Sequence, residues 1–134
     1  MRRMPPVVFG LVLVTASLLG LSGCDWVTYH GSGTRSGVLA GGAQVRSTST
    51  AWQSALDGAV YGAPVTAAGS VFVATEHDVV YALDPATGRA RWRTTVGKPV
   101  PRSALPCGNI DPLGITGTPA FDPVSKRLFV VAET

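Results

Sequence analysis

The sequence has few cysteines: only Cys24 and Cys107 occur among its 134 residues. A thiolate zinc cluster needs more cysteines than this, and the two histidines, His30 and His77, lack the close spacing of paired zinc ligands. The sequence therefore excludes a cysteine-based zinc centre. If Cys24 is modified, as argued below, Cys107 is either a free thiol or pairs with a cysteine outside this sequence.

Charged residues are also scarce, at 14% of the chain, and they form no basic run. The formal net charge of +3 includes Arg2 and Arg3, and without these two residues it falls to about +1. Proteins that bind nucleic acid usually carry a basic patch or stripe that contacts phosphates. We therefore expect no nucleic-acid partner.

The common catalytic motifs are missing as well. Gly31-Ser32-Gly33 does not extend into the Gly-x-Ser-x-Gly frame of hydrolases, and no Gly-x-x-x-x-Gly-Lys phosphate-binding loop occurs. The sequence thus offers no catalytic residue, no metal ligand set and no identifiable cofactor site. This disfavours an enzyme.

No apolar run reaches the roughly 20 residues of a membrane-spanning helix. A shorter apolar stretch, Val7 to Leu21, follows Arg2-Arg3 and ends at Ser22-Gly23-Cys24. This order is typical of a cleavable export signal. Residues 21–24, Leu-Ser-Gly-Cys, resemble the lipobox of bacterial lipoproteins, in which the cysteine takes a diacylglyceryl group and the signal is cut just before it.

The lipobox resemblance implies that residues 1–23 are a lipoprotein signal peptide and that Cys24 is the lipidation site. Two or more acyl chains, such as palmitate, anchor a protein stably without spanning the bilayer. We therefore expect a protein held at the cell membrane, on its extracytoplasmic side, by lipid on Cys24. The alternative is an ordinary secretory signal with a cysteine near its cleavage site.

Residues 24–50 are rich in glycine, serine and threonine, which predicts a flexible tether or lead-in. Trp26 and Tyr29 are larger than a spacer requires, so part of this segment should pack on the body of the protein.

Short strands are predicted from residue 51 onward. Residues 71–75 and 79–83 are rich in β-branched and aromatic side chains, and Glu76-His77-Asp78 between them suits a hairpin turn. A second turn is expected at residues 84–88, where Asp84 can accept backbone hydrogen bonds and Gly88 can adopt a positive φ. The chain should therefore reverse twice.

Residues 89–96 alternate between two faces, which predicts a half-buried strand. One face would carry Ala90, Trp92, Thr94 and Val96, and the other Arg89, Arg91 and Arg93. Trp92 would then cover the face between neighbouring units. The arginine row could bind an anion, but alternating arginines more often block pairing at a sheet edge.

The sequence contains an internal repeat of a short Gly-x-Pro motif followed by an apolar strand. Gly62-Ala63-Pro64 and Gly117-Thr118-Pro119 lie 55 residues apart, and each precedes an apolar strand. Trp52 precedes the first copy as Trp92 precedes the second. Trp52 would therefore lie in the last strand of an earlier unit whose first strands are not recognised in this sequence. Four short strands per unit, with a tryptophan in the outermost one, are typical of β-propeller blades.

Residues 78–92 read Asp-Val-Val-Tyr-Ala-Leu-Asp-Pro-Ala-Thr-Gly-Arg-Ala-Arg-Trp. This segment resembles the repeat Gly-x-Val-Tyr-Ala-Leu-Asp-x-x-Thr-Gly-x-x-x-Trp of the quinoprotein-like propellers, also called PQQ-binding-like repeats. The resemblance implies an all-β fold, and residues 51–134 would hold about one and a half four-stranded blades. We expect a partial β-propeller, incomplete at the C-terminus, after a signal peptide and a tether.

Enzymes of this family hold pyrroloquinoline quinone and calcium with carboxylates, a stacking tryptophan and often a vicinal disulfide. Here no Cys-Cys pair occurs, Glu76 and Asp78 fall in a predicted turn, and Trp92 suits packing. Many relatives are binding or scaffold proteins without quinone. We therefore expect a membrane-anchored envelope lipoprotein whose repeats act as a binding or assembly module.

The partner of such a module would be another protein, or a second copy of the chain, at the incomplete blade edges. The alternative is the N-terminal part of a pyrroloquinoline-quinone-dependent dehydrogenase, with that quinone and calcium as cofactors.

Overall fold

The computed structural model describes residues 25–39 and 45–134, so the predicted signal peptide, residues 1–23, and Cys24 lie outside the described residues. The described chain is all-β except for one short 3-10 helix, η1 (Arg102–Ala104), as the sequence predicts. No helix in this part of the chain has the length and apolar character needed to cross a bilayer. The strands are β1 (Val65–Ala67), β2 (Ser70–Ala74), β3 (Val79–Leu83), β4 (Ala90–Thr95), β5 (Ala120–Asp122) and β6 (Arg127–Phe129).

The first four strands form one antiparallel sheet in the order β1-β2-β3-β4, and β5 and β6 form a second sheet. Both predicted turns of the first sheet are confirmed. Asp84 Oδ1 accepts the backbone N–H groups of Ala86 at 2.9 Å and Thr87 at 3.0 Å, and Gly88 closes the turn with a φ of 70°. This is the left-handed region that favours glycine.

The alternation predicted along β4 is wrong at its start. A register shift places Trp92 opposite Ala82 but Ala90 opposite Leu83, so Ala90 is out of phase with Trp92. The shift leaves Arg91 between these pairs, where its guanidinium forms a 2.7 Å ion pair with Asp84 and donates to the Gly69 carbonyl oxygen at 2.7 Å. Arg91 therefore ties the β3–β4 turn to the β1–β2 turn.

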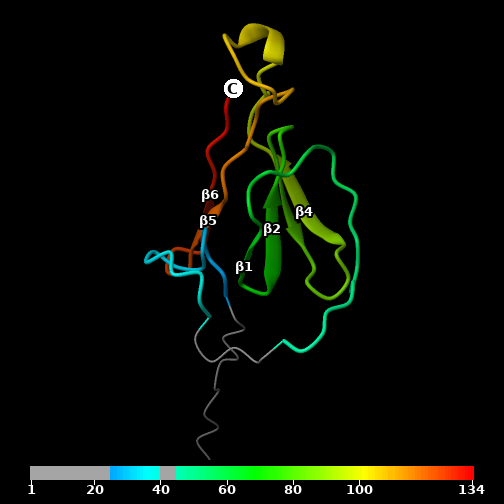
Figure 1. Ribbon diagram of the computed structural model, residues 1–134, viewed down its shortest axis with the longest axis vertical. Coiled ribbons are helices and arrows are strands. Elements are labelled where there is room, and N and C mark those ends of the chain that lie inside the picture. The colour runs from blue at the N-terminus through cyan, green and yellow to red at the C-terminus, as the bar shows by residue number, and fades with distance from the viewer. Residues whose placement is uncertain (1–24, 40–44) are drawn as a thin grey trace, which may run out of the picture.

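Both faces of the first sheet are apolar, and each face is covered by a different segment (Figure 1). On one face Phe72 stacks on Phe121 of β5, with ring centroids 5.8 Å apart, and Leu128 of β6 packs on the same cluster. On the other face Trp52 and Leu56 pack against a cluster from β2 and β3. This layered stacking is the packing expected of neighbouring propeller blades.

Trp52 belongs to no strand, contrary to the predicted last strand of an earlier unit, but it packs where such a unit would. Its Nε1–H donates to the Pro85 carbonyl oxygen at 2.8 Å. Its ring also lies so close to Gly88 that an added Cβ there would overlap it. The indole thus docks directly on the β3–β4 turn.

The two copies of the Gly-x-Pro repeat contact each other. The backbone N–H of Ala63 donates to Thr118 Oγ1 at 3.0 Å. A Cβ on Gly62 would collide with the Gly117 carbonyl group. The repeat seen in the sequence therefore corresponds to equivalent positions of adjacent sheets.

The predicted half-burial of β4 is wrong, because all six of its residues are exposed. Trp92 reaches Phe72, with ring centroids 5.9 Å apart, but remains 45% exposed. Phe121 and Leu128 of the second sheet pack on residues of β1, β2 and β3, and β4 is left uncovered.

Gly88→Ala should destabilise the fold through both backbone and packing. A non-glycine residue in the left-handed region costs roughly 1–2 kcal/mol, and the added methyl group would also displace Trp52. Gly69→Ala is the matched control, because Gly69 has the same φ of 70° and nothing within 4 Å of an added Cβ. In urea unfolding followed by tryptophan fluorescence, Gly88→Ala should lose more stability than Gly69→Ala. Equal losses would contradict the docking role of Trp52.

Candidate functional site

Two carboxylates are buried at the β2–β3 turn: Glu76 is 2% exposed and Asp78 is fully buried. Glu76 is held from two sides. Its backbone N–H donates to the Ala59 carbonyl oxygen at 2.9 Å, and its Oε2 accepts the Gly114 N–H at 2.7 Å. The sequence identifies these residues only as part of a turn, so their burial is a finding of the structure.

This acid pair, Glu76 and Asp78, lacks compensating partners. Within the described residues, Glu76 Oε1 and both Asp78 carboxylate oxygens have no hydrogen-bond partner. The only ion pair in this part of the chain joins Arg91 to Asp84. Burial, and then the neighbouring Glu76 carboxylate, raise the pKa of Asp78 above its ordinary value. The acid pair is therefore an unneutralised buried site.

Two glycines make room for the Asp78 carboxylate. A Cβ on Gly97 would lie 3.0 Å from Asp78 Oδ2, and a Cβ on Gly114 would lie 2.6 Å from Oδ1. Gly97 follows β4 and Gly114 precedes β5. The carboxylate is thus enclosed by the connection between the two sheets.

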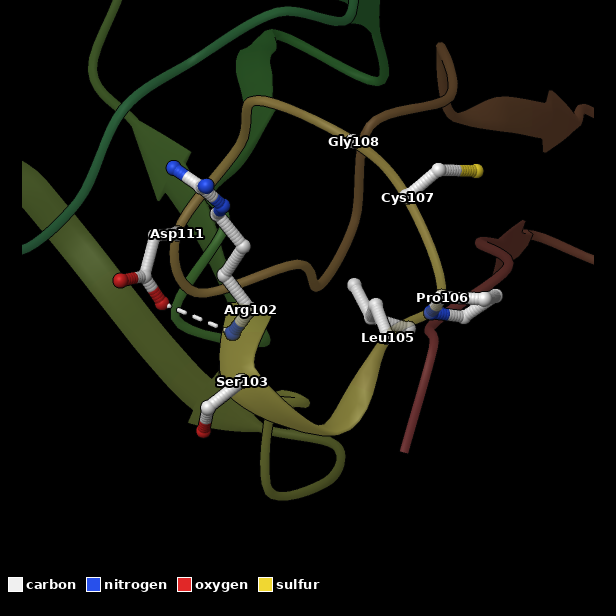
Figure 2. Close-up of a pocket in the computed structure, with 7 residues that line it drawn as sticks. All are labelled: Arg102, Ser103, Leu105, Pro106, Cys107, Gly108 and Asp111. Atoms are coloured by element: carbon white, nitrogen blue, oxygen red, sulfur yellow. Dashed lines mark hydrogen bonds between the residues drawn. The ribbon is translucent and has the colours of Figure 1, made fainter.

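A separate surface depression of about 410 Å³ lies beside η1 (Figure 2). Its Asp111 Oδ1 accepts the backbone N–H of Arg102 at 3.0 Å, which fixes the chain around the depression. Cys107 lines the same depression and is an exposed free cysteine. In Figure 2 its sulfur points away from Arg102 and Asp111, so the thiol is not grouped with these charged side chains.

The outward side of β6 is exposed and carries Arg127 and Phe129. Among the described residues β6 pairs only with β5. Leu128 packs toward the first sheet, whereas Phe129 is 56% exposed and Val131, just beyond the strand, is 82% exposed. An open strand edge with apolar side chains is a template for pairing with another strand.

The two histidines noted in the sequence are not brought together. The His30 ring stacks on Tyr29, with centroids 4.0 Å apart, and its Nδ1 lies 3.2 Å from the Arg35 carbonyl oxygen. His77 is exposed beside Gly58. Trp26 of the lead-in pairs with Thr66 of β1 through backbone hydrogen bonds, so part of the lead-in lies on the body of the protein, whereas Tyr29 is 49% exposed.

Two depressions of the described surface can be compared with what pyrroloquinoline quinone needs, which is an aromatic ring to stack on. Neither the depression beside η1 nor a smaller one of about 250 Å³ beside Gly114 has an aromatic ring in its wall. Trp52 is occupied by the β3–β4 turn, and glycine backbone encloses the acid pair. A quinone ring would therefore find no aromatic stacking surface in either depression.

Asp78→Asn should stabilise the protein at neutral pH in buffer containing EDTA. Asparagine keeps the side-chain shape and tolerates the φ of 58° at this position, but it carries no charge. Folding raises the pKa of Asp78, so the protonated carboxyl favours the folded state. The free energy of unfolding is therefore highest below the unfolded pKa of Asp78 and falls as the pH rises through its folded pKa. Urea unfolding should show the advantage of the variant vanishing below pH about 3.8.

Asp84→Asn is the control, and its expected effect on stability at neutral pH is opposite to that of Asp78→Asn. The Arg91 guanidinium and the turn N–H groups lower the pKa of Asp84 to about 2, so its stabilising effect is present above the unfolded pKa and is lost as the pH falls through about 2. Asp84→Asn should therefore destabilise the protein at neutral pH. A loss of stability in Asp78→Asn at neutral pH as well would show that the buried carboxylate is compensated.

Comparison with known proteins gives one result that covers most of the chain. The family model described as outer membrane protein assembly factor BamB matches residues 35–132. No curated protein gives a significant match. The matched region contains both sheets, the docked Trp52 and both copies of the Gly-x-Pro repeat. The chain therefore belongs to the BamB-like family of PQQ-binding-like repeat proteins.

Proposed function

We propose that this protein is a lipid-anchored protein of the cell envelope whose propeller repeats bind another polypeptide and act in assembly. The family match supports an assembly role, since the family is described by an outer membrane protein assembly factor. The lipobox-like residues 21–24 support a lipid anchor. Fold alone does not decide the function, so the binding surface is argued from particular residues.

The observation that carries the proposal is the open edge of β6. Its backbone has β5 on one side only among the described residues, and Phe129 and Val131 extend the apolar surface outward. Strand addition supplies affinity through main-chain hydrogen bonds and specificity through alternate side chains. The bound segment would be an extended strand of another protein or of a second copy.

The anchor is tested by metabolic labelling with a fatty-acid analogue. Cys24→Ala should abolish the label and leave an uncleaved precursor, because the thiol at position 24 receives the lipid. Cys107→Ala is the matched control, since it removes the other cysteine of the chain and should keep the label. Unchanged labelling of Cys24→Ala would rule out this anchor.

The binding surface is tested by photo-crosslinking in intact cells. A photoreactive amino acid at position 129 should give an adduct with a second polypeptide, identified by mass spectrometry. The same amino acid at position 38 is the control, because Val38 is 74% exposed but lies in the lead-in, outside both sheets. Absence of an adduct at position 129, or equal adducts at both positions, would argue against strand addition at β6.

A further inference from the structure

We propose that the acid pair, Glu76 and Asp78, binds a hard divalent cation of the calcium type at the β2–β3 turn. The site is distinct from the open edge of β6 and does not depend on the binding function proposed above. It is built from two carboxylates and the backbone around them.

The first argument is the number of buried oxygens without partners. Glu76 Oε1 and Asp78 Oδ1 and Oδ2 make no hydrogen bond within the described part of the chain, and both residues are more than nine-tenths buried. An isolated buried carboxylate is strongly unfavourable, and two adjacent ones repel each other. One divalent cation would neutralise both charges and supply a partner for all three oxygens.

The second argument is the fixed geometry of the pair. The Gly114 N–H holds Glu76 Oε2 at 2.7 Å, which leaves Oε1 as the free oxygen of that carboxylate. The Asp78 carboxylate lies between Gly97 and Gly114, in space that a Cβ on either glycine would restrict. The Glu76 carbonyl oxygen also lies against Gly114. The Glu76 carbonyl oxygen and Asp78 Oδ1 therefore lie on the same side of Gly114.

The third argument concerns the surroundings of the pair and the kind of ion. Gly114, whose N–H holds Glu76, also lines a depression of about 250 Å³, and Glu133 in the wall of this depression adds negative charge. Oxygen donors suit calcium and magnesium, whereas zinc prefers the imidazole and thiolate ligands that are missing here. His77, although it lies between the two acids in sequence, is exposed beside Gly58.

The composition of the site sets its expected strength. The described residues contain no cluster of three or more histidine, cysteine, aspartate or glutamate side chains placed to hold a metal. Carbonyl oxygens and water must therefore complete the coordination shell. Calcium sites of modest charge in extracellular modules bind with dissociation constants of about 0.1–1 mM, and we expect this range.

Cation binding would join the two sheets. Glu76 and Asp78 belong to the turn of the first sheet, whereas Gly97 and Gly114 belong to the connection that leads to the second. The bound ion would hold this connection against the turn. Calcium should therefore raise the stability of the packing between the sheets.

The test uses the full chain, purified in detergent and freed of metal with EDTA. Calcium chloride should give binding heat in calorimetry, and calcium at about ten times its dissociation constant should raise the folding equilibrium constant about tenfold. Asp78→Asn and Glu76→Gln should remove both responses. Glu76→Gln keeps a side-chain oxygen to accept the Gly114 N–H, so this variant should still fold.

Asp122→Asn is the matched control, because it removes a carboxylate from the exposed β5–β6 turn and should respond to calcium as the unchanged protein does. The proposal is overturned if calcium produces neither heat nor stabilisation in the unchanged protein. It is also overturned if Asp78→Asn and Glu76→Gln respond to calcium as strongly as Asp122→Asn.

Discussion

The structure depends on one constraint: the first sheet has two apolar faces, so it is stable only with a neighbour on each side. Every residue of β3 is buried, although its side chains point alternately to opposite faces. Phe121 and Leu128 cover one face, and Trp52 and Leu56 cover the other. A single blade of this kind cannot bury its surface alone, which is why repeats of this kind stack.

The β2–β3 turn connects these layers. The backbone N–H of Glu76 bonds to Ala59 in the segment before the sheet, and its carboxylate bonds to Gly114 in the segment after it. The Asp78 carbonyl oxygen accepts the Val96 N–H at the end of β4 at 2.9 Å. The turn therefore holds three segments together, and its two charges are buried because of this central position. The unfavourable burial is a local consequence of how the layers are joined.

Much of this fold follows from the sequence, for identifiable reasons. The Asp84 turn and Gly88 depend on local backbone preferences, and the two hairpin strands depend on runs of β-branched and aromatic residues, so both are predicted correctly. The spacing of the Gly-x-Pro repeat also predicts a second unit, and the structure places Ala63 and Thr118, at equivalent positions of the two copies, in contact. These features are encoded within short segments or by a simple period.

The missed features depend on contacts between distant segments. The burial of Asp78 requires Gly97 and Gly114, which lie 19 and 36 residues further along the chain, and a charged residue in a turn normally lies in solvent. The exposure of Trp92 likewise depends on how far the second sheet extends, which no pattern in β4 encodes. Periodicity identifies a face of a strand, but it does not show what covers that face.

Trp52 shows what Trp92 requires to become buried. Trp52 is fixed by a turn that offers a carbonyl oxygen to its indole N–H and a glycine beneath its ring. Trp92 occupies the equivalent outer position of the next unit, yet among the described residues no such turn lies against it. The half-exposed indole and the open edge of β6 are on the same side of the first sheet, since Trp92 reaches Phe72 and Phe72 stacks on Phe121. A polypeptide that paired with β6 and placed a turn over Trp92 would therefore continue the packing that already joins the first sheet to Trp52.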